Sequence, residues 1–283
     1  MNNNDERKNK LTFALTNARS LGPKIGSLID YFEELDIAFA LITETWLVKG
    51  RDLERNVEDL ELGENIAIIN KNRHNRKGGG VAILYRKDGC KLGEYKIIGN
   101  GWEIVAAVGK LNRDSRKLLV ITAYFPPKMD TEQLAGALKA VEDTVRRVKM
   151  ENEDPYIIIG GDMNRHNLKP AVLPFPDIKE LDSPPTRGDA RLDLVYTNIH
   201  ESVDGVHTHP PLQSNTGIES DHNMLVISGE IKHKHSFKII TKIIQPITED
   251  GQRQFEYELA NTDWDRLQGS TPSESATLLD GRL

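Results

Sequence analysis

The positions of hydrophobic and polar residues predict strand-like segments and helix-like segments that follow one another along the chain. Apolar runs typical of buried strands occur in "IAFALITET", which ends at Thr45, and in "YIIIGGD", which ends at Asp162; "LTFALTN" alternates like a strand up to Asn17, and "KLLVITAY" is a further strand that ends at Tyr124. Between them, "KIGSLIDYFEELD" (24–36) and "TEQLAGALKAVEDTVRRVKM" (131–150) place apolar residues at helical spacing. The pattern therefore predicts strands that interleave with two amphipathic helices.

Several neighbouring strands are expected to pair as hairpins. "IAIIN" and "GGGVAILYR" flank the basic segment "NKNRHNRK", and "WEIVAAVGKL" precedes "KLLVITAY"; "RLDLVYTN" and "NMLVISGEI" are later strands. Gly78, Gly79 and Gly80 lead into a strand, whereas a P-loop ends in Gly-Lys-Ser/Thr before a helix, so they predict a tight turn or bulge. Hairpins mixed with helices favour an α/β fold with mixed sheets over a doubly wound parallel sheet.

The strand pattern weakens after Ile231, which predicts three regions. Residues 1–10 are a flexible N-terminus, 11–232 form one domain, and 233–283 are a C-terminal extension that is partly disordered. Within that extension, Phe255, Leu259, Trp264 and Leu267 are spaced for a small amphipathic helix.

Composition narrows the classes of protein. The chain has 283 residues with 38% hydrophobic and 28% charged, as in a globular protein, and no apolar run is long enough to predict a membrane span. Cys90 is the only cysteine, so no intrachain disulfide is expected and a reducing compartment is the simpler assumption. The net charge of −6 argues at first against a nucleic-acid partner, but most of the excess acid lies after residue 244. The basic segment 70–77 is then either a solvated hairpin end or a phosphate contact.

Polar side chains recur where the apolar strands stop. They are Asn17, Glu44, Tyr124, Asp162 with Asn164, and the run Ser220-Asp221-His222. The ends of strands at the rim of a sheet hold their side chains in well-defined positions, so these side chains can converge on one point. Each has an ordinary alternative, such as a turn cap at Asp162 or Asn17, or a core position at Tyr124. The two glycines before Asp162 are interpreted as a sharp turn out of the sheet.

The residue types point to hydrolysis of a phosphate ester. Carboxylates with an amide suit a hard cation such as Mg²⁺, and a histidine beside an acid suits a phosphate oxygen. A Ser-His nucleophile pair is not evident. Metal-assisted attack of water accounts for more of these residues than any other reaction considered.

The ordered set resembles the endonuclease/exonuclease/phosphatase family from about Leu11 to Ile231. The matching motifs are Asn17, "TET" with Glu44, "TAY" with Tyr124, "GGDMN", "LDLV" with Asp193, and "SDH". Within the family, "LITETWL", "RHNRKGGGVAILYR" and "PTRGDARLDLVYTN" look like the apurinic/apyrimidinic-like endonuclease domain of non-LTR retrotransposons. The resemblance implies a four-layer sandwich of two packed mixed β-sheets flanked by helices. The later "RQFEYELANTDWDRL" is similar to the segment that joins such a domain to a reverse transcriptase, which implies a larger polyprotein.

The resemblance also implies a role for each residue. Glu44, with Asn17 and Asp221, would hold Mg²⁺, for which Mn²⁺ can substitute. Asp162 would orient or deprotonate the attacking water, with Asn164 fixing it; His222, oriented by Asp193, would stabilise the phosphate, and Tyr124 the phosphate or the departing oxygen. Phosphate oxygens would be bound by Ser220, Thr186, Arg73 and Arg76, or Ser220 and Thr186 would support neighbouring site residues.

The expected activity is a Mg²⁺-dependent DNA endonuclease that nicks one strand of double-stranded DNA and leaves a 3′-hydroxyl, acting in the nucleus or elsewhere inside the cell. One alternative keeps the fold and metal but acts on abasic DNA or on a lipid or nucleotide phosphoester. Another is a catalytically dead binding module, against which the complete acid, amide and histidine set argues. Only the short "RGDARL" separates Thr186 from Asp193, where some relatives carry a longer hairpin, so little surface is expected for reading the target sequence.

Overall fold

The computed structural model describes residues 10–48, 60–73, 78–97, 99, 101–112, 114–231 and 249–261. The chain divides into two units, Met1–Lys234 and His235–Leu283. The predicted boundary at residue 232 lies outside the described residues and stays a prediction. In the second unit the described part is helix α5 (Glu249–Ala260), which contains Phe255; Trp264 and Leu267 of the predicted helix lie outside the described residues.

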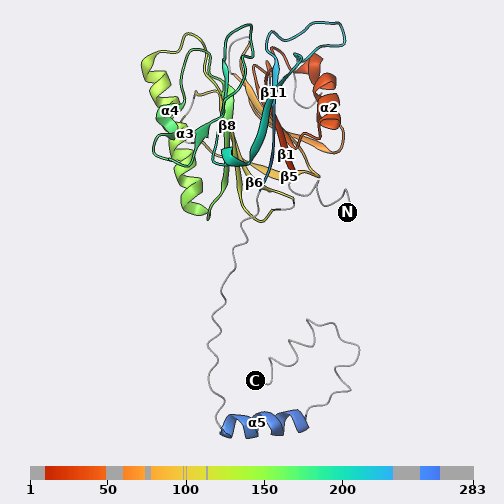
Figure 1. The fold of residues 1–283 in the computed structure, drawn as a ribbon, viewed down its shortest axis with the longest axis vertical. Coiled ribbons are helices and arrows are strands. Elements are labelled where there is room, and N and C mark those ends of the chain that lie inside the picture. Colours follow the sequence, from red (N-terminus) through yellow and green to blue (C-terminus); the bar gives the residue numbers. More distant parts are fainter. Residues whose placement is uncertain are drawn as a thin grey trace. The chain divides into compact units, whose positions relative to one another are not determined.

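The first unit contains two six-stranded sheets (Figure 1). The first sheet has the order β11 (Val203–His209), β12 (Met224–Glu230), β1 (Lys10–Asn17), β2 (Phe39–Thr43), β4 (Val81–Arg86) and β3 (Ile66–Lys71). The second has the order β5 (Cys90–Tyr95), β6 (Ile104–Leu111), β7 (Leu118–Tyr124), β8 (Tyr156–Asp162), β10 (Asp193–Thr197) and β9 (Lys179–Glu180). Within each sheet one pair is parallel, β1 with β2 and β7 with β8, and the other pairs are antiparallel. The prediction of mixed sheets with hairpins is confirmed.

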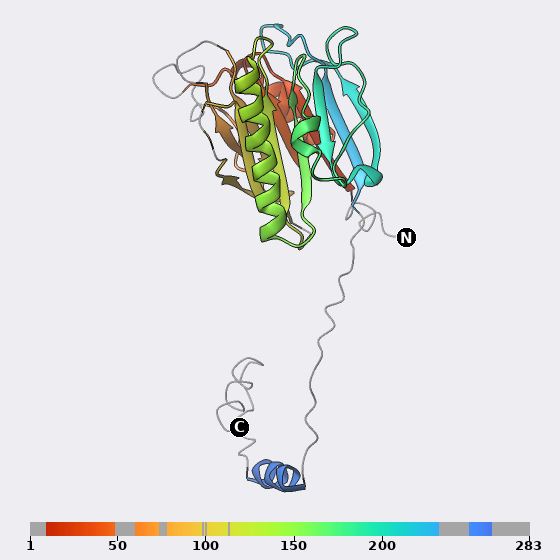
Figure 2. The same cartoon turned by 90° about the vertical axis from the view of Figure 1, so that its left-hand side faces the viewer.

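Helices cover the outer face of each sheet. The short turn η1 (Gly22–Lys24) leads into α2 (Ile25–Glu34), whose buried Leu28 and Phe32 pack on the first sheet. The long helix α3 (Thr131–Glu151) begins at a capping box, in which Asp130 and Gln133 each accept from the other's backbone N–H, and it covers the second sheet with α4 (Lys169–Val172). Figure 2 shows α3 running along the outer face of its sheet; a further short turn, η3 (His200–Ser202), precedes β11.

Three apolar clusters show that the first unit has four layers. One contains residues of both sheets, such as Phe13 and Leu41 from the first and Val120 and Ile158 from the second, so the two sheets pack face to face. The other two lie between each sheet and its helices. The predicted four-layer sandwich is confirmed, and the reason is local: β2 and β8 are buried on both faces because each face meets another layer.

Strand directions bring the predicted site residues to one edge. Because β1 and β2 are parallel, Asn17 pairs with Thr43, the residue before Glu44. In the second sheet, Tyr124 pairs with Asp162, and Asp162 pairs with the first residue of the antiparallel strand β10. The ends of parallel strands and the start of an antiparallel neighbour therefore meet at the same rim, although they are far apart in the sequence.

The interpretation of the double glycine before Asp162 was wrong. Gly160 and Gly161 do not form a turn; both lie inside β8 and are paired on both sides, with Thr122 and Ala123 in β7 among their partners. A Cβ at Gly161 would lie 1.7 Å from the carbonyl oxygen of Ala123. The glycine is required because β7 and β8 approach each other too closely for a side chain.

Gly161→Ala is expected to lower the free energy of unfolding by about 3 kcal/mol, because the added methyl forces β7 and β8 apart. Denaturant titration measures the effect. Gly93→Ala is the matched control: Gly93 also lies in a strand, but a Cβ added there would have its nearest neighbouring atom 3.9 Å away, so a small change is expected. Equal stabilities for the two variants would contradict the close-approach explanation.

Three strands were not predicted, and all three lie at sheet edges. These are β5, β9 and β11, whose residues are largely half-buried or exposed. Their sequences lack a long apolar run because only part of each strand meets the core.

Cys90, at the start of β5, is a buried free thiol. Among the described residues, no helix is both long enough and apolar enough to cross a bilayer.

Candidate active site

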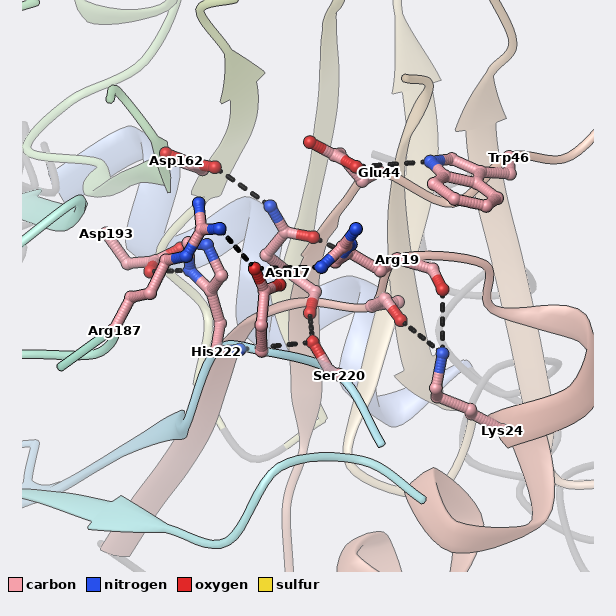
Figure 3. Close-up of polar contacts among 12 residues, drawn as sticks. Asn17, Arg19, Lys24, Glu44, Trp46, Asp162, Arg187, Asp193, Ser220 and His222 are labelled. Atoms are coloured by element: carbon pink, nitrogen blue, oxygen red, sulfur yellow. Dashed lines mark hydrogen bonds and ion pairs between the residues drawn. The ribbon is translucent and has the colours of Figure 1, made fainter. Parts of the chain in front are cut away.

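Asn17 and Asp162 join the two sheets at the rim. Asn17 Nδ2 donates to Asp162 Oδ2 at 2.8 Å, and both side chains are buried. Each residue also caps the turn that follows its strand: Arg19 N donates to Asn17 Oδ1 at 3.1 Å, and Asn164 N donates to Asp162 Oδ1 at 2.9 Å. The turn-cap interpretation is therefore confirmed for both residues, and the second polar atom of each side chain is used in the contact between the sheets (Figure 3), while their roles in a site stay predictions.

Glu44 makes a second connection between the sheets. Tyr124 Oη donates to Glu44 Oε1 at 2.7 Å, and Trp46 Nε1 donates to Glu44 Oε2 at 3.2 Å. The loop that holds Glu44 has left-handed backbone at Glu44 (φ 48°) and Trp46 (φ 55°), which is uncommon for such residues and is typical of functional sites.

The triple glycine supports this loop, and its prediction as a turn before a strand is confirmed. Thr45 N donates to the Gly80 carbonyl at 3.2 Å, and Trp46 N donates to the Gly79 carbonyl at 2.9 Å. All three glycines have positive φ, and a Cβ on Gly80 would lie 2.5 Å from Thr45 Oγ1. The three glycines therefore let the segment before β4 lie directly against the loop that contains Glu44.

His222 and Asp193 form a buried hydrogen-bonded pair. His222 Nδ1 lies 2.7 Å from Asp193 Oδ2, and the same oxygen accepts from Thr186 Oγ1. Ser220 Oγ donates to the Asn17 carbonyl and accepts from His222 N at 3.3 Å. These contacts fix the imidazole ring and leave Nε2 as the ring nitrogen without a hydrogen-bond partner among the described residues.

The electrostatics of the group are set by three buried side chains. Asp162, Asp193 and His222 bring ligand atoms within 4.8 Å of one another. Burial raises the pKa of the Asp162 carboxyl, and the charge of Asp193 raises it further, to about 7 after the opposing effects of His222, Asn164 and Asn17. Burial by itself lowers the pKa of His222, but the hydrogen bond and charge of Asp193 outweigh it and the pKa is raised. Asp193 therefore favours the protonated form of the His222 ring.

The residues present fit a divalent cation. Two buried carboxylate oxygens, Asp193 Oδ1 and Asp221 Oδ1, have no hydrogen-bond partner within the described part of the chain. Burying neighbouring carboxylates is costly without positive charge, and the raised pKa of Asp162 reports that cost. Carboxylate and amide oxygens are the donors that Mg²⁺ and Mn²⁺ accept.

Other predicted residues have partners that bear on their roles. Asn164 has left-handed backbone (φ 49°), so the chain turns directly after Asp162, and Asn164 Nδ2 donates to the Phe125 carbonyl at 2.8 Å. Arg73 Nε donates to Glu103 Oε1 at 2.6 Å, and its guanidinium lies 5.7 Å from the centre of the Tyr124 ring. Arg76 lies outside the described residues. The proton of each hydroxyl of Ser220, Thr186 and Tyr124 is already donated to a protein acceptor, so their phosphate-binding roles stay predictions.

Four residues at the rim were missed by sequence reasoning. Glu103 holds both Arg73 and the backbone N–H of Gly80, and Lys24 donates to three backbone carbonyls of the turn after β1. Arg19 and Arg187 both pair with Asp221. Glu103 directly precedes β6, but its contacts, like those of the two arginines, depend on strand pairing and loop positions that have no signal in the local sequence.

The fold and the site together define a metal-dependent phosphoesterase built on two packed mixed sheets. The chain belongs to the endonuclease/exonuclease/phosphatase family, whose model matches residues 14–222. A search of curated protein sequences found no match.

Three solved structures show the same fold at low sequence identity. The endonuclease domain of TRAS1, a telomere-specific non-LTR retrotransposon, is 16% identical, with a TM-score of 0.60 over 79% of this chain and 100% of that chain. The AP endonuclease LMAP from Leishmania major is 12% identical, with a TM-score of 0.61 over 82% and 91%. A mannosyl-6-phosphatase from Bacteroides thetaiotaomicron is 14% identical, with a TM-score of 0.55 over 77% and 98%.

Proposed function

We propose that this chain is a Mg²⁺-dependent DNA endonuclease that hydrolyses one phosphodiester bond, nicks one strand and leaves a 3′-hydroxyl, as target-primed retrotransposition requires. The observation that carries the proposal is the convergence of Asp162, the Asp193–His222 pair and Glu44 at one rim. The similarity of fold to the TRAS1 endonuclease domain and the retrotransposon-like motifs support DNA as substrate. Membership in a larger polyprotein and action in the nucleus are part of the same proposal.

The cation supplies positive charge to the phosphate oxygens and lowers the pKa of water when bound. Glu44, with Asn17 and Asp221, would hold it. Glu44 Oε1 and Oε2 each accept one hydrogen bond, which leaves lone pairs for a ligand, and Asp221 Oδ1 has no hydrogen-bond partner among the described residues.

The chain's own groups would handle the proton and the phosphate charge. Asp162, with a pKa of about 7, is suited to accept a proton from the attacking water near neutral pH. His222, whose protonated form is favoured by Asp193, would donate a hydrogen bond from Nε2 to a phosphate oxygen and stabilise the charge that develops there. Burial raises the pKa of Tyr124, so its hydroxyl stays protonated and can act on phosphate only after it releases Glu44.

Nicking of a supercoiled plasmid tests the proposal. We expect Mg²⁺ to support conversion to open circles and excess EDTA to abolish it, because removing the cation leaves the carboxylates of the site uncompensated. A DNA polymerase should extend the nicks, since extension requires a 3′-hydroxyl. Binding of DNA without turnover in any divalent cation would instead support the catalytically dead module.

Abasic DNA is a second candidate substrate. The AP endonuclease LMAP matches this fold as well as the TRAS1 domain does, with TM-scores of 0.61 and 0.60. The turn between Thr186 and Asp193 is short, with a bridge between Arg187 and Ala190, so it offers little surface for reading sequence. Strong preference for a duplex with one abasic site over the intact duplex would favour this candidate, and cleavage of soluble phosphoesters alone would favour a phosphatase.

A further inference from the structure

Two arginines from separate loops converge on one carboxylate beside the site. Arg19 Nη1 lies 2.9 Å from Asp221 Oδ2, and Arg187 Nη2 lies 2.7 Å from the same oxygen. In Figure 3, Arg187 lies on the left of the view, where its side chain overlaps Asp193 and His222, and Arg19 lies to the right of Asn17. We call Arg19 and Arg187 the arginine pair.

Both members of the arginine pair, and Asp221, lie within two positions of a site residue in the sequence. Arg19 follows Asn17 by two positions, and its N–H donates to Asn17 Oδ1. Arg187 directly follows Thr186, which bonds Asp193, and Asp221 lies between Ser220 and His222. The backbones of Arg19, Arg187 and Asp221 are therefore each next to a site residue, and the ion pairs with Asp221 bring both guanidinium groups to the same place.

Lys24 makes the loop of Arg19 rigid. Its side chain is buried, and Nζ donates to the carbonyls of Ala18 at 2.9 Å and Arg19 at 2.7 Å. Arg19 and Ser20 have positive φ, so this turn needs such support. A buried lysine used to fix a strained turn indicates that the position of Arg19 matters more than in an ordinary surface ion pair.

The charge balance of the arginine pair favours an anion. Two guanidinium groups face one carboxylate, which leaves a surplus positive charge at the rim. The side chains of Arg19 and Arg187 are 47% and 52% exposed, so donors that Asp221 does not use remain accessible to a ligand. The neighbouring acids, Glu44, Asp162 and Asp193, would repel a polyanion, and positive charge at the rim offsets that repulsion.

We propose that the arginine pair, oriented by Asp221, binds phosphate groups of the DNA strand that flank the scissile phosphate. The inference rests on the proposed function, because only a substrate with more than one phosphate uses cations both at and beside the reacting group. It assigns Arg19 and Arg187 as substrate-binding residues and Asp221 as the residue that positions them, in addition to its proposed support of the cation.

The test measures how DNA affinity depends on salt. Fluorescence anisotropy with a short duplex and Mg²⁺ is performed on proteins that also carry Asp162→Asn, so that the DNA stays intact. Arg19→Gln and Arg187→Gln are each expected to weaken binding about tenfold at low salt, because each removes a charged contact to phosphate. The slope of log Kd against log salt concentration should fall by about one for each arginine.

Arg146→Gln is the matched control. Arg146 has 50% side-chain exposure and a 2.7 Å ion pair with Glu142, but it lies in helix α3 on the outer layer, so Kd and slope should equal those of the parent. If the slopes of the arginine variants equal the parental slope, any loss of affinity is the same at every salt concentration. The inference is then wrong, and the arginines have only a structural role. Unchanged melting temperatures confirm that the variants are folded.

Failure of the proposed function gives a different result. If wild-type protein nicks DNA and only the salt slopes are unchanged, the inference fails alone. If wild-type protein neither nicks nor binds the duplex, the proposed function fails and the inference fails with it.

Discussion

Asp162→Asn is expected to lower the rate constant of strand nicking by about 10³-fold, equivalent to about 4 kcal/mol of barrier. Asparagine keeps the size and shape of the side chain but cannot accept a proton from water. Asp162 also helps to join the two sheets at the rim, by its hydrogen bond with Asn17. The size of the effect follows because the substitution removes the group proposed to accept the proton of the attacking water.

The same substitution should not unfold the protein. Asp162 is a buried carboxylate beside Asp193, and both its burial and that neighbouring charge raise its pKa. Removing the charge relieves this repulsion and offsets the loss of one hydrogen-bond acceptor, so in EDTA the melting temperature is expected to stay close to the wild-type value.

Nicking rates and melting curves check both parts. Asp143→Asn is the matched control, because Asp143 forms an ion pair with Lys139 on helix α3, away from the rim. Loss of activity in parallel with a large loss of stability would show that Asp162 acts by holding the sheets together and would contradict the catalytic role.

His222→Ala is expected to lower the nicking rate by a similar factor, about 10² to 10³, because it removes the charge proposed to face the phosphate. Asp193→Asn should lower the rate through the same route, since Asp193 touches His222 Nδ1 and acts by orienting and charging the ring. The double variant should therefore be no slower than the slower single variant.

The stability of these variants separates the roles further. His222→Ala leaves Asp193 buried with Thr186 as its remaining described hydrogen-bond partner, which is costly for an ionised carboxylate. Adding Asp193→Asn should then recover part of the lost melting temperature. Thr186→Val is the control for a smaller change near Asp193. Losses of rate that multiply in the double variant would show that the two residues act independently.

Strand content and the list of candidate residues were predictable from local pattern. The apolar runs that end at Asn17, Tyr124 and Asp162 form β1, β7 and β8, and a polar residue at the end of a buried strand has few structural reasons to be there. The edge strands β5, β9 and β11 were not predicted, because a half-exposed strand carries a weak hydrophobic signal.

The glycines show where local reasoning fails. Gly160 and Gly161 suggested a turn by residue type, yet they are paired within β8, and the reason for Gly161 is an atom of Ala123 in another strand. In the same way, Glu103 gains its contacts with Arg73 and Gly80 from the pairing of β6 with β7 and of β4 with β2.

By itself, the sequence determined which segments form buried strands and helices, that the sheets are mixed, and which polar residues stand at the strand ends. Only the tertiary structure decided that Asn17 bonds Asp162, that His222 bonds Asp193, and that Arg19 and Arg187 share Asp221. The physical reason is that hydrophobic periodicity is a property of neighbouring residues. Contacts between strand ends instead depend on strand order and direction, which are set by the packing of the whole domain.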